Sequence, residues 1–507
     1  MARRSNALSF CGGFTGICLV LAGCGAEVST SRLSGSDASR GNDATQSIDP
    51  DQPTYVRVAQ SLVTREFVAR RGFIRDHGRS AEFALGWLPG SQYADLRDEG
   101  ADVVKLDEKR FAREAFDLRT LMPLDTDRFA ESETVRERGT LAEDYHNYEK
   151  LTTELKNLAD SAPDLVRLES AGRSTNGREL WVARVGNFAA AAASGESEPA
   201  GPKLLYIANM HGDETVGREL MIYLLRKLVR EYDSAPRIRD LVDHSQIFIM
   251  PSMNPDGFEA GQRWNARTRD LNRNFPDFTS DPRDIPGNRE AETKAVMALH
   301  GAHDFTLAMN HHGGDVCFNM PWDTTANDDA RTKFGDDRLI RTLGREYADA
   351  NPTMRANNSS GFDDGLTYGY EWYEVDGGMQ DWSIFYRNST HATLELSYTK
   401  YPPAAQLPRF WAENEAPLIR YLERGQTGVH LEVVDSEGRG VINPSVSVTG
   451  STRAVAFRTS KVHRIALAGQ VNATVSAPGF APVTVATTAA PFRGTYERIV
   501  LSRSAAR

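Results

Sequence analysis

The central part of the chain, about residues 141–424, alternates between two hydrophobic periods. Apolar positions recur with helical spacing at 145–159, 216–232, 289–299 and 407–422. Short apolar runs rich in β-branched residues predict strands at 165–172, 179–186, 203–210, 246–250, 305–310 and 392–397. This alternation predicts an α/β domain in which helices cover both faces of a twisted, mostly parallel or mixed sheet. Active sites in such sheets lie outside the carboxyl ends of the strands.

The pattern changes on both sides of this domain. Residues 54–107 alternate strand-like and helical segments, which predicts a small α/β module, and residues 108–140 read as a charged linker without clear periodicity. After residue 425 the helical spacing stops, and short strands follow at regular spacing with turn residues between them. Residues 425–507 are therefore predicted to form a β-sandwich.

The first 24 residues have the features of an export signal. Arg3 and Arg4 precede a largely apolar stretch, and Leu-Ala-Gly-Cys24 follows it. This ending resembles a bacterial lipobox, which implies that 1–23 are a signal peptide and that Cys24 carries lipid; the alternative is a plain secretory signal in which Cys24 is incidental. Residues 24–53 have almost nothing to bury and are predicted to be a disordered tether. We expect an exported protein that is lipid-anchored to the cell envelope, at the outer membrane or cell surface rather than free in the periplasm.

Composition excludes several classes of partner. The 507 residues include 59 basic and 69 acidic side chains, for a net charge of −10. An acidic chain without a dense run of Lys and Arg lacks the electrostatic footprint of a nucleic-acid-binding protein. Beyond the N-terminus no apolar run approaches the ~18 residues that a membrane span needs. Three of the four cysteines lie in the first 24 residues, so no disulfide framework is expected. The oligomeric state stays open.

One candidate for metal binding follows a predicted strand. His211 and Glu214, in His-Gly-Asp-Glu, come directly after the strand 203–210 and offer an imidazole and a carboxylate to one zinc ion. The spacing alone is weak evidence, because His146 and Glu149 share it at the start of a predicted helix. For that second pair the simpler interpretation is a solvated surface. A catalytic zinc also needs a third protein ligand and an open position for water.

The best source of a third ligand is the end of the strand 305–310. His311 and His312 follow it and meet a Gly-Gly turn. Adjacent side chains of a strand point to opposite faces, so at most one of these two imidazoles faces the site. The stretch 263–277 contains four arginines in a loop-like context, which suits it either to binding an anion or to a solvated surface.

Six sequence motifs of the central domain occur in the order of a known enzyme family. They resemble the metallocarboxypeptidases of the N/E (regulatory) subfamily, alongside carboxypeptidases D, E, M and N. The motifs are HGDETVGRE, NPDGFE, the stretch 263–277, HGGD with PWD, GGMQDW and TLELSYTKYPP. The resemblance covers about residues 141–424, and 425–507 resembles the transthyretin-like domain that follows the catalytic domain in that subfamily. It implies a carboxypeptidase-like fold and zinc-dependent hydrolysis of C-terminal peptide bonds in peptides or proteins.

The resemblance also implies a role for each matching residue. His211, Glu214 and His312 match the ligands of one zinc ion, since the family pattern places the histidine before Gly-Gly. Glu395 matches the glutamate that takes a proton from zinc-bound water and passes it to the leaving amine. Arg263 matches the arginine that stabilises the developing oxyanion.

Five further residues match groups that bind the substrate. Asn272, Arg273 and Tyr373 correspond to the groups that hold the terminal carboxylate. Asp323 corresponds to the aspartate at the bottom of the specificity pocket, and Gln380 to a polar residue that lines it, which implies release of C-terminal Lys or Arg. The alternative for Asp323 is an N-cap of a helix in the segment that follows.

The chain departs from the family pattern at several positions. Asp213 stands where the family usually has Asn, and this extra acid either weakens the orientation of the site or strengthens zinc binding. Tyr398 replaces a cysteine, and Thr268 and Arg269 replace Gly-Val. None of these changes removes a catalytic group, so the resemblance implies an active enzyme.

Two other functions are compatible with this sequence. The first keeps the chemistry but acts on cell-wall stem peptides, whose diaminopimelate carries both an amine and a carboxylate. The second is an inactive surface-binding protein that uses its accessory domains. Such a protein is expected to have lost a zinc ligand or Glu395, whereas this chain retains all four residues.

Overall fold

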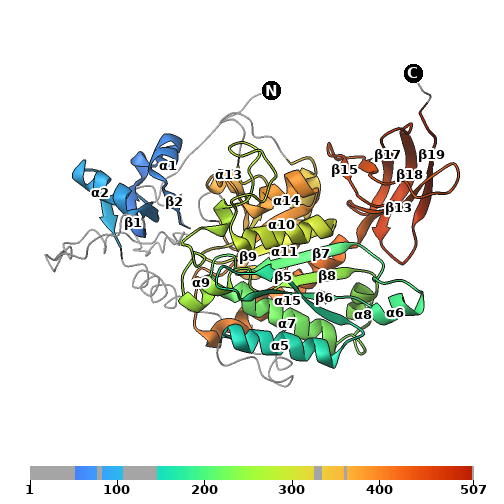
Figure 1. Ribbon diagram of the computed structural model, residues 1–507, viewed down its shortest axis with the longest axis horizontal. Coiled ribbons are helices and arrows are strands. Elements are labelled where there is room, and N and C mark those ends of the chain that lie inside the picture. Colours follow the sequence, from blue (N-terminus) through green and yellow to red (C-terminus); the bar gives the residue numbers. More distant parts are fainter. Residues whose placement is uncertain (1–51, 77–82, 107–144, 325–333, 359–361, 505–507) are drawn as a thin grey trace, which may run out of the picture. The chain divides into compact units, whose positions relative to one another are not determined.

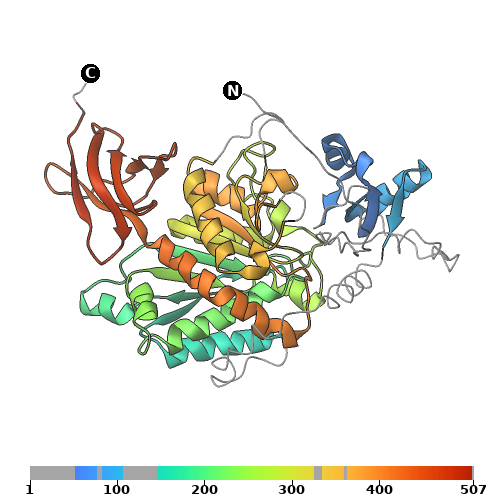
Figure 2. The ribbon, with the colours of Figure 1, turned by 180° about the vertical axis from the view of Figure 1, so that it is seen from behind.

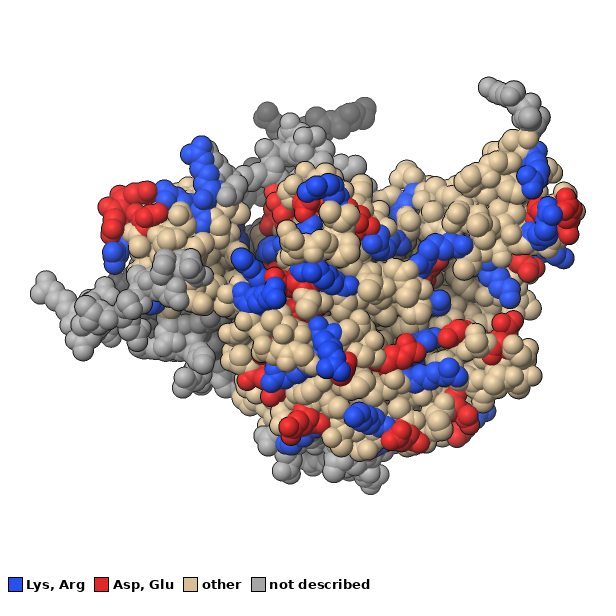
Figure 3. Space-filling view, in the orientation of Figure 1, with Lys and Arg blue, Asp and Glu red and all other residues tan. Residues whose placement is uncertain are grey.

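The computed structural model describes residues 52–76, 83–106, 145–324, 334–358 and 362–504 (Figure 1). The predicted signal peptide, Cys24, nearly all of the predicted tether and the linker 108–140 lie outside the described residues. No helix in the described ranges is long and apolar enough to cross a membrane. Basic and acidic side chains are interspersed over the face of the molecule that Figure 3 shows.

The central domain is built on an eight-stranded mixed sheet with the order β11-β10-β12-β9-β7-β8-β6-β5. Its strands are β5 (Val166–Arg173), β6 (Glu179–Val185), β7 (Lys203–Ala208), β8 (Gln246–Met250), β9 (Phe305–His312), β10 (Val316–Met320), β11 (Leu366–Tyr368) and β12 (Thr390–Leu396). The four neighbours β12, β9, β7 and β8 run parallel, whereas β10 is antiparallel to β12 and β6 is antiparallel to β8. The predicted mixed sheet is confirmed.

Helices cover both faces of this sheet, as the sequence predicted (Figure 1). Leu204, Tyr206 and Ala208 of β7 pack on one side, and the alternate residues Leu205 and Ile207 pack on the other. The first side is covered by α5 (Tyr148–Ser161), α7 (Val216–Arg230), α8 (Pro236–Asp243), α11 (Asp337–Asp349) and α15 (Leu407–Gly425). The second is covered by α10 (Ala291–Ala302) and α14 (Met379–Arg387). Figure 2 shows the long helix α15, in orange, crossing its face of the sheet.

Short helices connect these elements at the edge of the sheet. They are α6 (Phe188–Ala193), α9 (Pro255–Ala260), η4 (Leu271–Arg273), α12 (Pro352–Arg355), α13 (Gly369–Trp372) and η5 (Ala404–Gln406). All four predicted helices and all six predicted strands of this domain are present. The predicted helix 145–159 begins at Tyr148, because the Asn147 side chain caps it by accepting a hydrogen bond from the backbone N–H of Lys150.

The N-terminal module has the predicted alternation of strands and helices. Its elements are β1 (Pro53–Ala59), η2 (Gln60–Leu62), α1 (Arg65–Arg71), β2 (Ile74–Arg75), β3 (Phe83–Pro89), α2 (Gly90–Asp98) and β4 (Val103–Lys105). The strands form an antiparallel sheet with the order β2-β3-β1-β4. Val56, Val58 and Leu88 on the sheet pack against Tyr93 and Leu96 of α2, so the module has a hydrophobic core of its own.

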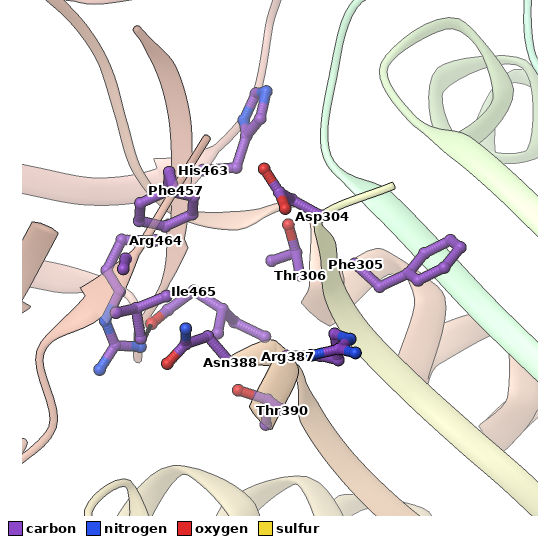
Figure 4. A pocket seen from close by; sticks show the side chains of 12 residues that line it. Asp304, Phe305, Thr306, Arg387, Asn388, Thr390, Phe457, His463, Arg464 and Ile465 are labelled. Carbon is purple, nitrogen blue, oxygen red and sulfur yellow. Dashed lines mark hydrogen bonds between the residues drawn. The ribbon is translucent and has the colours of Figure 1, made fainter. Parts of the chain in front are cut away.

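The C-terminal region consists of short strands, as the sequence predicted. They are β13 (Thr427–Asp435), β14 (Ser445–Val448), β15 (Val455–Ala456), β16 (Lys461–Ile465), β17 (Gly469–Ser476), β18 (Val483–Pro491) and β19 (Glu497–Leu501). Valines and leucines of β13, β14, β17 and β19 share one core, as expected of a β-sandwich. A buried ion pair of 2.6 Å joins Arg464 of β16 to Asp336. A small pocket beside it is lined by Asp304, Arg387 and His463 among others (Figure 4).

Candidate active site

Three buried side chains converge at the carboxyl ends of β7 and β9. Nδ1 of His211 lies 2.9 Å from Oε1 of Glu214, and Nδ1 of His312 lies 2.8 Å from Oε2 of Glu214. The two Nδ1 atoms are 3.1 Å apart. Within the described part of the chain, this is the one group of three His, Cys, Asp or Glu side chains whose ligand atoms all lie within 4.8 Å of one another. Two imidazoles and one carboxylate fit a catalytic zinc ion with an open fourth position.

The loop after β7 presents two of these ligands in a fixed conformation. Asn209 has a left-handed backbone conformation with φ of 56°, which Asn tolerates better than most residues. Its Nδ2 donates to the backbone carbonyls of His211, Gly212 and Glu214. A Cβ at Gly212 would lie 2.1 Å from the carbonyl carbon of Gly257, so this position requires glycine. The HGDE motif therefore depends on the NPDG motif for its shape.

The register of the sheet selects His312 over His311. His311 points to the opposite face, where its Nδ1 lies 2.9 Å from the carbonyl oxygen of Ile207 and its ring makes an edge contact with Tyr206. The expectation that at most one of the two faces the site is confirmed, and it is His312.

The interpretation of His146 as a solvated residue is wrong. Its ring is buried, and its Nδ1 lies 2.7 Å from Oε2 of Glu219 on α7. Glu149 is exposed and takes no part in this pair. The pair that His146 forms spans 73 residues of sequence, which the local spacing does not reveal. His146 therefore has a structural role and lies outside the group of candidate metal ligands.

Glu395 lies beside the metal-ligand group because β12 pairs with β9. The parallel register places Glu395 directly opposite His312, and both line the same pocket. Glu395 is only 2% exposed. Burial raises the pKa of its carboxyl well above the ordinary value, and the neighbouring carboxylates of Glu214 and Asp315 raise it further. A carboxyl with this environment suits a group that exchanges protons during a reaction.

Arg263 is a buried cation that contacts two carboxylates of the site. Its guanidinium donates to Oδ2 of Asp270 at 3.0 Å and to Oε1 of Glu214 at 3.3 Å. Burial by itself would lower the pKa of Arg263, but Asp270 and Glu214 outweigh it and raise the pKa. Asp270 in turn lies 3.0 Å from Nε2 of His211, so one carboxylate orients both a candidate ligand and the arginine. Asp270 was not predicted as a site residue, although it lies inside the motif 263–277.

One pocket joins these groups to the predicted substrate-binding residues. Asn272 and Tyr373 line it together with Glu395 and the candidate ligands His211 and His312. Burial raises the pKa of the Tyr373 hydroxyl above its ordinary value, so the hydroxyl is a hydrogen-bond donor. Arg273, which adjoins Asn272 in the chain, is half-buried, and its Nη1 donates to the Asn272 carbonyl at 3.0 Å.

The other end of this pocket is acidic. Asp323 is buried there, and its Oδ1 accepts hydrogen bonds from Nδ2 of Asn319 at 2.8 Å and from Nε2 of Gln380 at 3.0 Å. Burial raises the pKa of Asp323 to about 6. Gly369 packs so closely that a Cβ there would lie 2.0 Å from Oδ1 of Asp323. The alternative role of Asp323 as a helix N-cap concerns the segment 324–330, of which 325–330 lie outside the described residues.

A second carboxylate supports the backbone at this end of the pocket. Asp381 accepts hydrogen bonds from the backbone N–H groups of Asp323 and Thr324. Burial, together with the nearby Asp323, raises its pKa well above the ordinary value. Asp381 lies in the motif GGMQDW, of which only Gln380 was predicted to have a role. The signal that could have identified Asp381 is its place directly after Gln380 in the same motif.

Lys400 lies between the site and the N-terminal module. Its Nζ is 2.8 Å from Oδ1 of Asp76 and 3.6 Å from Oδ2 of Asp213. The acid that replaces the usual Asn at position 213 therefore faces a cation. Trp87 of β3 packs against the charged groups of both Lys400 and Arg263, at 4.9 and 5.1 Å from the ring centre. The module thus contacts a residue of the candidate site.

The chain is similar to known proteins in sequence and in fold. The sequence pattern of the family described as zinc carboxypeptidase matches residues 151–416. The chain belongs to the zinc carboxypeptidase family. This metallocarboxypeptidase is therefore a peptide hydrolase, and the predictions of an enzyme and of a zinc cofactor are confirmed.

Individual relatives cover most of the chain. The zinc carboxypeptidase is 38% identical over 355 residues to carboxypeptidase M of Mus musculus, a match that spans 66% of this chain and 78% of the relative. It is 34% identical over 402 residues to the catalytic chain of carboxypeptidase N of Homo sapiens, across 71% and 86% of the two chains. The crystal structure of carboxypeptidase A from Helicoverpa armigera superposes with a TM-score of 0.52 over 74% of this chain and 98% of that chain. At 18% identity, this superposition shows a common fold alone.

Proposed function

We propose that this metallocarboxypeptidase releases C-terminal Lys or Arg from peptides or proteins. The observation that carries the proposal is the single pocket that joins the metal-ligand group and Glu395 to the buried carboxylate of Asp323. A substrate side chain that enters this pocket to its acidic end leaves its scissile bond beside the group of His211 and His312. The match to relatives named carboxypeptidase M and carboxypeptidase N supports the same reaction.

The end of the substrate is recognised by neutral and basic donors. Asn272, Arg273 and Tyr373 supply an amide, a guanidinium and a hydroxyl, which together suit a terminal carboxylate. The terminal carboxylate is present only at a chain end, so these donors restrict cleavage to the last peptide bond. Arg273 also compensates the negative charge that the carboxylate brings into a pocket already containing Asp323 and Glu395.

Proton transfer and charge stabilisation fall to two buried residues. His211, Glu214 and His312 would hold a zinc ion, which would supply the Lewis-acid chemistry that activates water and polarises the scissile carbonyl. Glu395 takes the proton from the attacking water and gives it to the leaving amine. Arg263, already held by Asp270, stabilises the negative charge that develops on the carbonyl oxygen.

Specificity for a basic residue follows from an excess of acceptors at the acidic end. The amide nitrogens of Asn319 and Gln380 are occupied by Asp323. Oδ1 of Asn319 and Oε1 of Gln380 are buried and have no hydrogen-bond partner among the described residues. A Lys or Arg side chain supplies donors and a positive charge, whereas an apolar side chain leaves these oxygens unsatisfied.

A panel of blocked dipeptides that differ only in the C-terminal residue tests this function. We expect the kcat/KM for Arg and Lys to exceed that for Leu and Phe by at least ~10²-fold, the scale set by leaving a buried charge unpaired. All activity is expected to disappear with a chelator and to return with zinc. A preference for Phe or Leu contradicts the assignment of the pocket, and a preference for diaminopimelate favours the stem-peptide alternative.

We also propose the domain limits and the membrane anchor that the sequence predicts. The C-terminal strands are proposed to form a transthyretin-like domain, and the boundaries at 54–107, 108–140, 141–424 and 425–507 are proposed as domain limits. Export and lipid anchoring are proposed from the N-terminal motif alone, with Cys24 as the lipid-bearing residue. The membrane would then be reached through the lipid, since the chain is acidic.

Substitution of Cys24 tests the anchor. We expect Cys24→Ser to move the protein from the membrane fraction into the soluble exported fraction, because the thiol is the proposed site of lipid attachment. Cell fractionation followed by immunoblotting measures the change, and Cys18→Ser, six residues earlier in the apolar stretch that precedes the motif, serves as the control. An unchanged distribution of Cys24→Ser refutes lipidation as the anchor.

A further inference from the structure

A chain of buried polar side chains extends from His312 away from the metal-ligand group. Nε2 of His312 lies 2.9 Å from Nδ2 of Asn310. On its other side, Oδ1 of Asn310 lies 3.0 Å from Nε2 of His391 and accepts a hydrogen bond from Oγ1 of Thr393 at 2.8 Å. Nδ1 of His391 lies 2.6 Å from Oγ of Ser383. All five side chains are at least 95% buried.

This chain of hydrogen-bonded side chains ends at a backbone carbonyl on α14. Oγ of Ser383 lies 3.0 Å from the carbonyl oxygen of Gln380, to which its hydroxyl can donate. The side chain of that same Gln380 donates to Asp323. The hydrogen bonds therefore link the metal-ligand group to the helix that supplies part of the acidic pocket. Neither the proposed reaction nor the binding of the terminal carboxylate uses Asn310, His391 or Ser383.

Without a metal, each group donates toward the metal-ligand group, from Ser383 through His391 and Asn310 to His312. Nδ1 of His312 carries a proton and donates to Glu214 at 2.8 Å, so its Nε2 accepts from the amide nitrogen of Asn310. The amide oxygen of Asn310 then accepts from Nε2 of His391. Burial lowers the pKa of His391 to about 3, so its ring is neutral. Its Nδ1 therefore accepts from the hydroxyl of Ser383.

A metal on Nδ1 of His312 requires the opposite direction. The ring nitrogen that binds a metal carries no proton, so the proton of the neutral imidazole lies on Nε2 and must be donated. A half-turn of the Asn310 amide exchanges its oxygen and nitrogen, which lets the oxygen accept that bond. Its nitrogen then donates to His391 and Thr393. His391 carries its proton on Nδ1 and donates to Ser383, whose hydroxyl donates to the carbonyl of Gln380.

We propose that Asn310, His391 and Ser383 are positioning residues for His312, and that metal binding at Nδ1 of His312 reverses the direction of their hydrogen bonds. No proton is gained or lost along the chain, since each imidazole gives up one ring proton and takes one at its other nitrogen. The Asn310 amide and the two imidazole rings each offer a donor and an acceptor, so these three groups keep their hydrogen bonds in both directions. The inference rests on His312 being a zinc ligand, as in the proposed function.

The tautomer of His391 provides a direct test in the full-length protein. Long-range ¹H–¹⁵N NMR spectra of protein labelled with ¹⁵N-histidine are recorded before and after zinc is added, and His391 is assigned by the loss of its signals in His391→Gln. We expect the His391 proton to lie on Nε2 without zinc and on Nδ1 with one equivalent. If zinc binds stoichiometrically and the His391 tautomer does not change, the proposed reversal of the hydrogen bonds is wrong and the proposed function still stands. Failure to bind stoichiometric zinc overturns both.

Zinc affinity provides the second measurement. Asn310→Leu removes the acceptor for His312, and we expect its zinc dissociation constant, measured by competition with a chelating dye, to rise about 10- to 100-fold. Asn310→Asp keeps an acceptor and is expected to stay close to the unmodified protein. His300→Gln changes another buried histidine, on α10, and is the matched control with unchanged affinity. An Asn310→Leu protein that is folded by circular dichroism and binds zinc as tightly as the unmodified chain overturns the proposal.

Discussion

Replacement of Glu395 by Gln is expected to lower kcat by roughly 10²- to 10⁴-fold, the contribution of a positioned general acid–base group. Gln has nearly the same shape and still forms hydrogen bonds, but it accepts no proton from water and gives none to the leaving amine. The side chain is buried beside the carboxylates of Glu214 and Asp315, so loss of its charge removes repulsion and is not expected to destabilise the fold. Single-turnover assays with a C-terminal Arg substrate measure the change.

Zinc content separates this effect from loss of the metal. Glu395→Gln is expected to retain one zinc ion per chain, because the group lies opposite His312 in the sheet and outside the ligand set. Glu214→Ala serves as the matched control, because Glu214 is as deeply buried as Glu395 but is a candidate zinc ligand. This variant is expected to lose both zinc and activity. Glu395→Gln protein with full zinc content and near-normal turnover contradicts the assignment of Glu395 as the proton-transfer group.

The architecture could be predicted from the local pattern of apolar residues, because each kind of element buries different faces. The apolar runs of β7, β8, β9 and β12 are buried on both faces, so they appear as continuous hydrophobic stretches, and the helices between them show one apolar side. The strand β10 was not predicted. It is held in the sheet by pairing with β11 and β12, which lie 46 or more residues later in the chain.

The site could be predicted only as far as motifs and strand ends define it. His211 follows β7 and His312 is the last residue of β9, and these two strands are neighbours in the sheet. The role of Glu395 came from the family resemblance. Asp270 was missed because its carboxylate acts through two partners, His211 and Arg263, of which one is 59 residues distant. His146 was misinterpreted for the same reason, since its buried partner is on α7. Long-range pairing is what a local pattern does not contain.

The ionisation of Asp323 gives the acidic pocket a pH dependence that differs between substrates. Burial raises its pKa to about 6, so the charged form that pairs with a basic side chain is lost as the pH falls through about 6. We expect kcat/KM for C-terminal Arg to fall below that pH more steeply than kcat/KM for C-terminal Leu, since this ratio reports the free enzyme. The two profiles share the ionisation of Glu395, so their quotient isolates the acidic end of the pocket, where Asp323 lies beside Asp381.

Asp323→Asn should remove both the preference and this difference. The amide keeps an oxygen for Asn319 and Gln380 but lacks the negative charge, so a Lys or Arg side chain enters the pocket without a counter-ion. Breaking such a buried pair costs ~3 to 5 kcal/mol, which corresponds to a loss of roughly 10²- to 10³-fold or more in kcat/KM on basic C-termini. Activity on Leu, weak in the unmodified enzyme, is expected to change little and serves as the internal control. If the variant keeps its preference for Arg over Leu, the charge that selects the substrate lies elsewhere in the pocket.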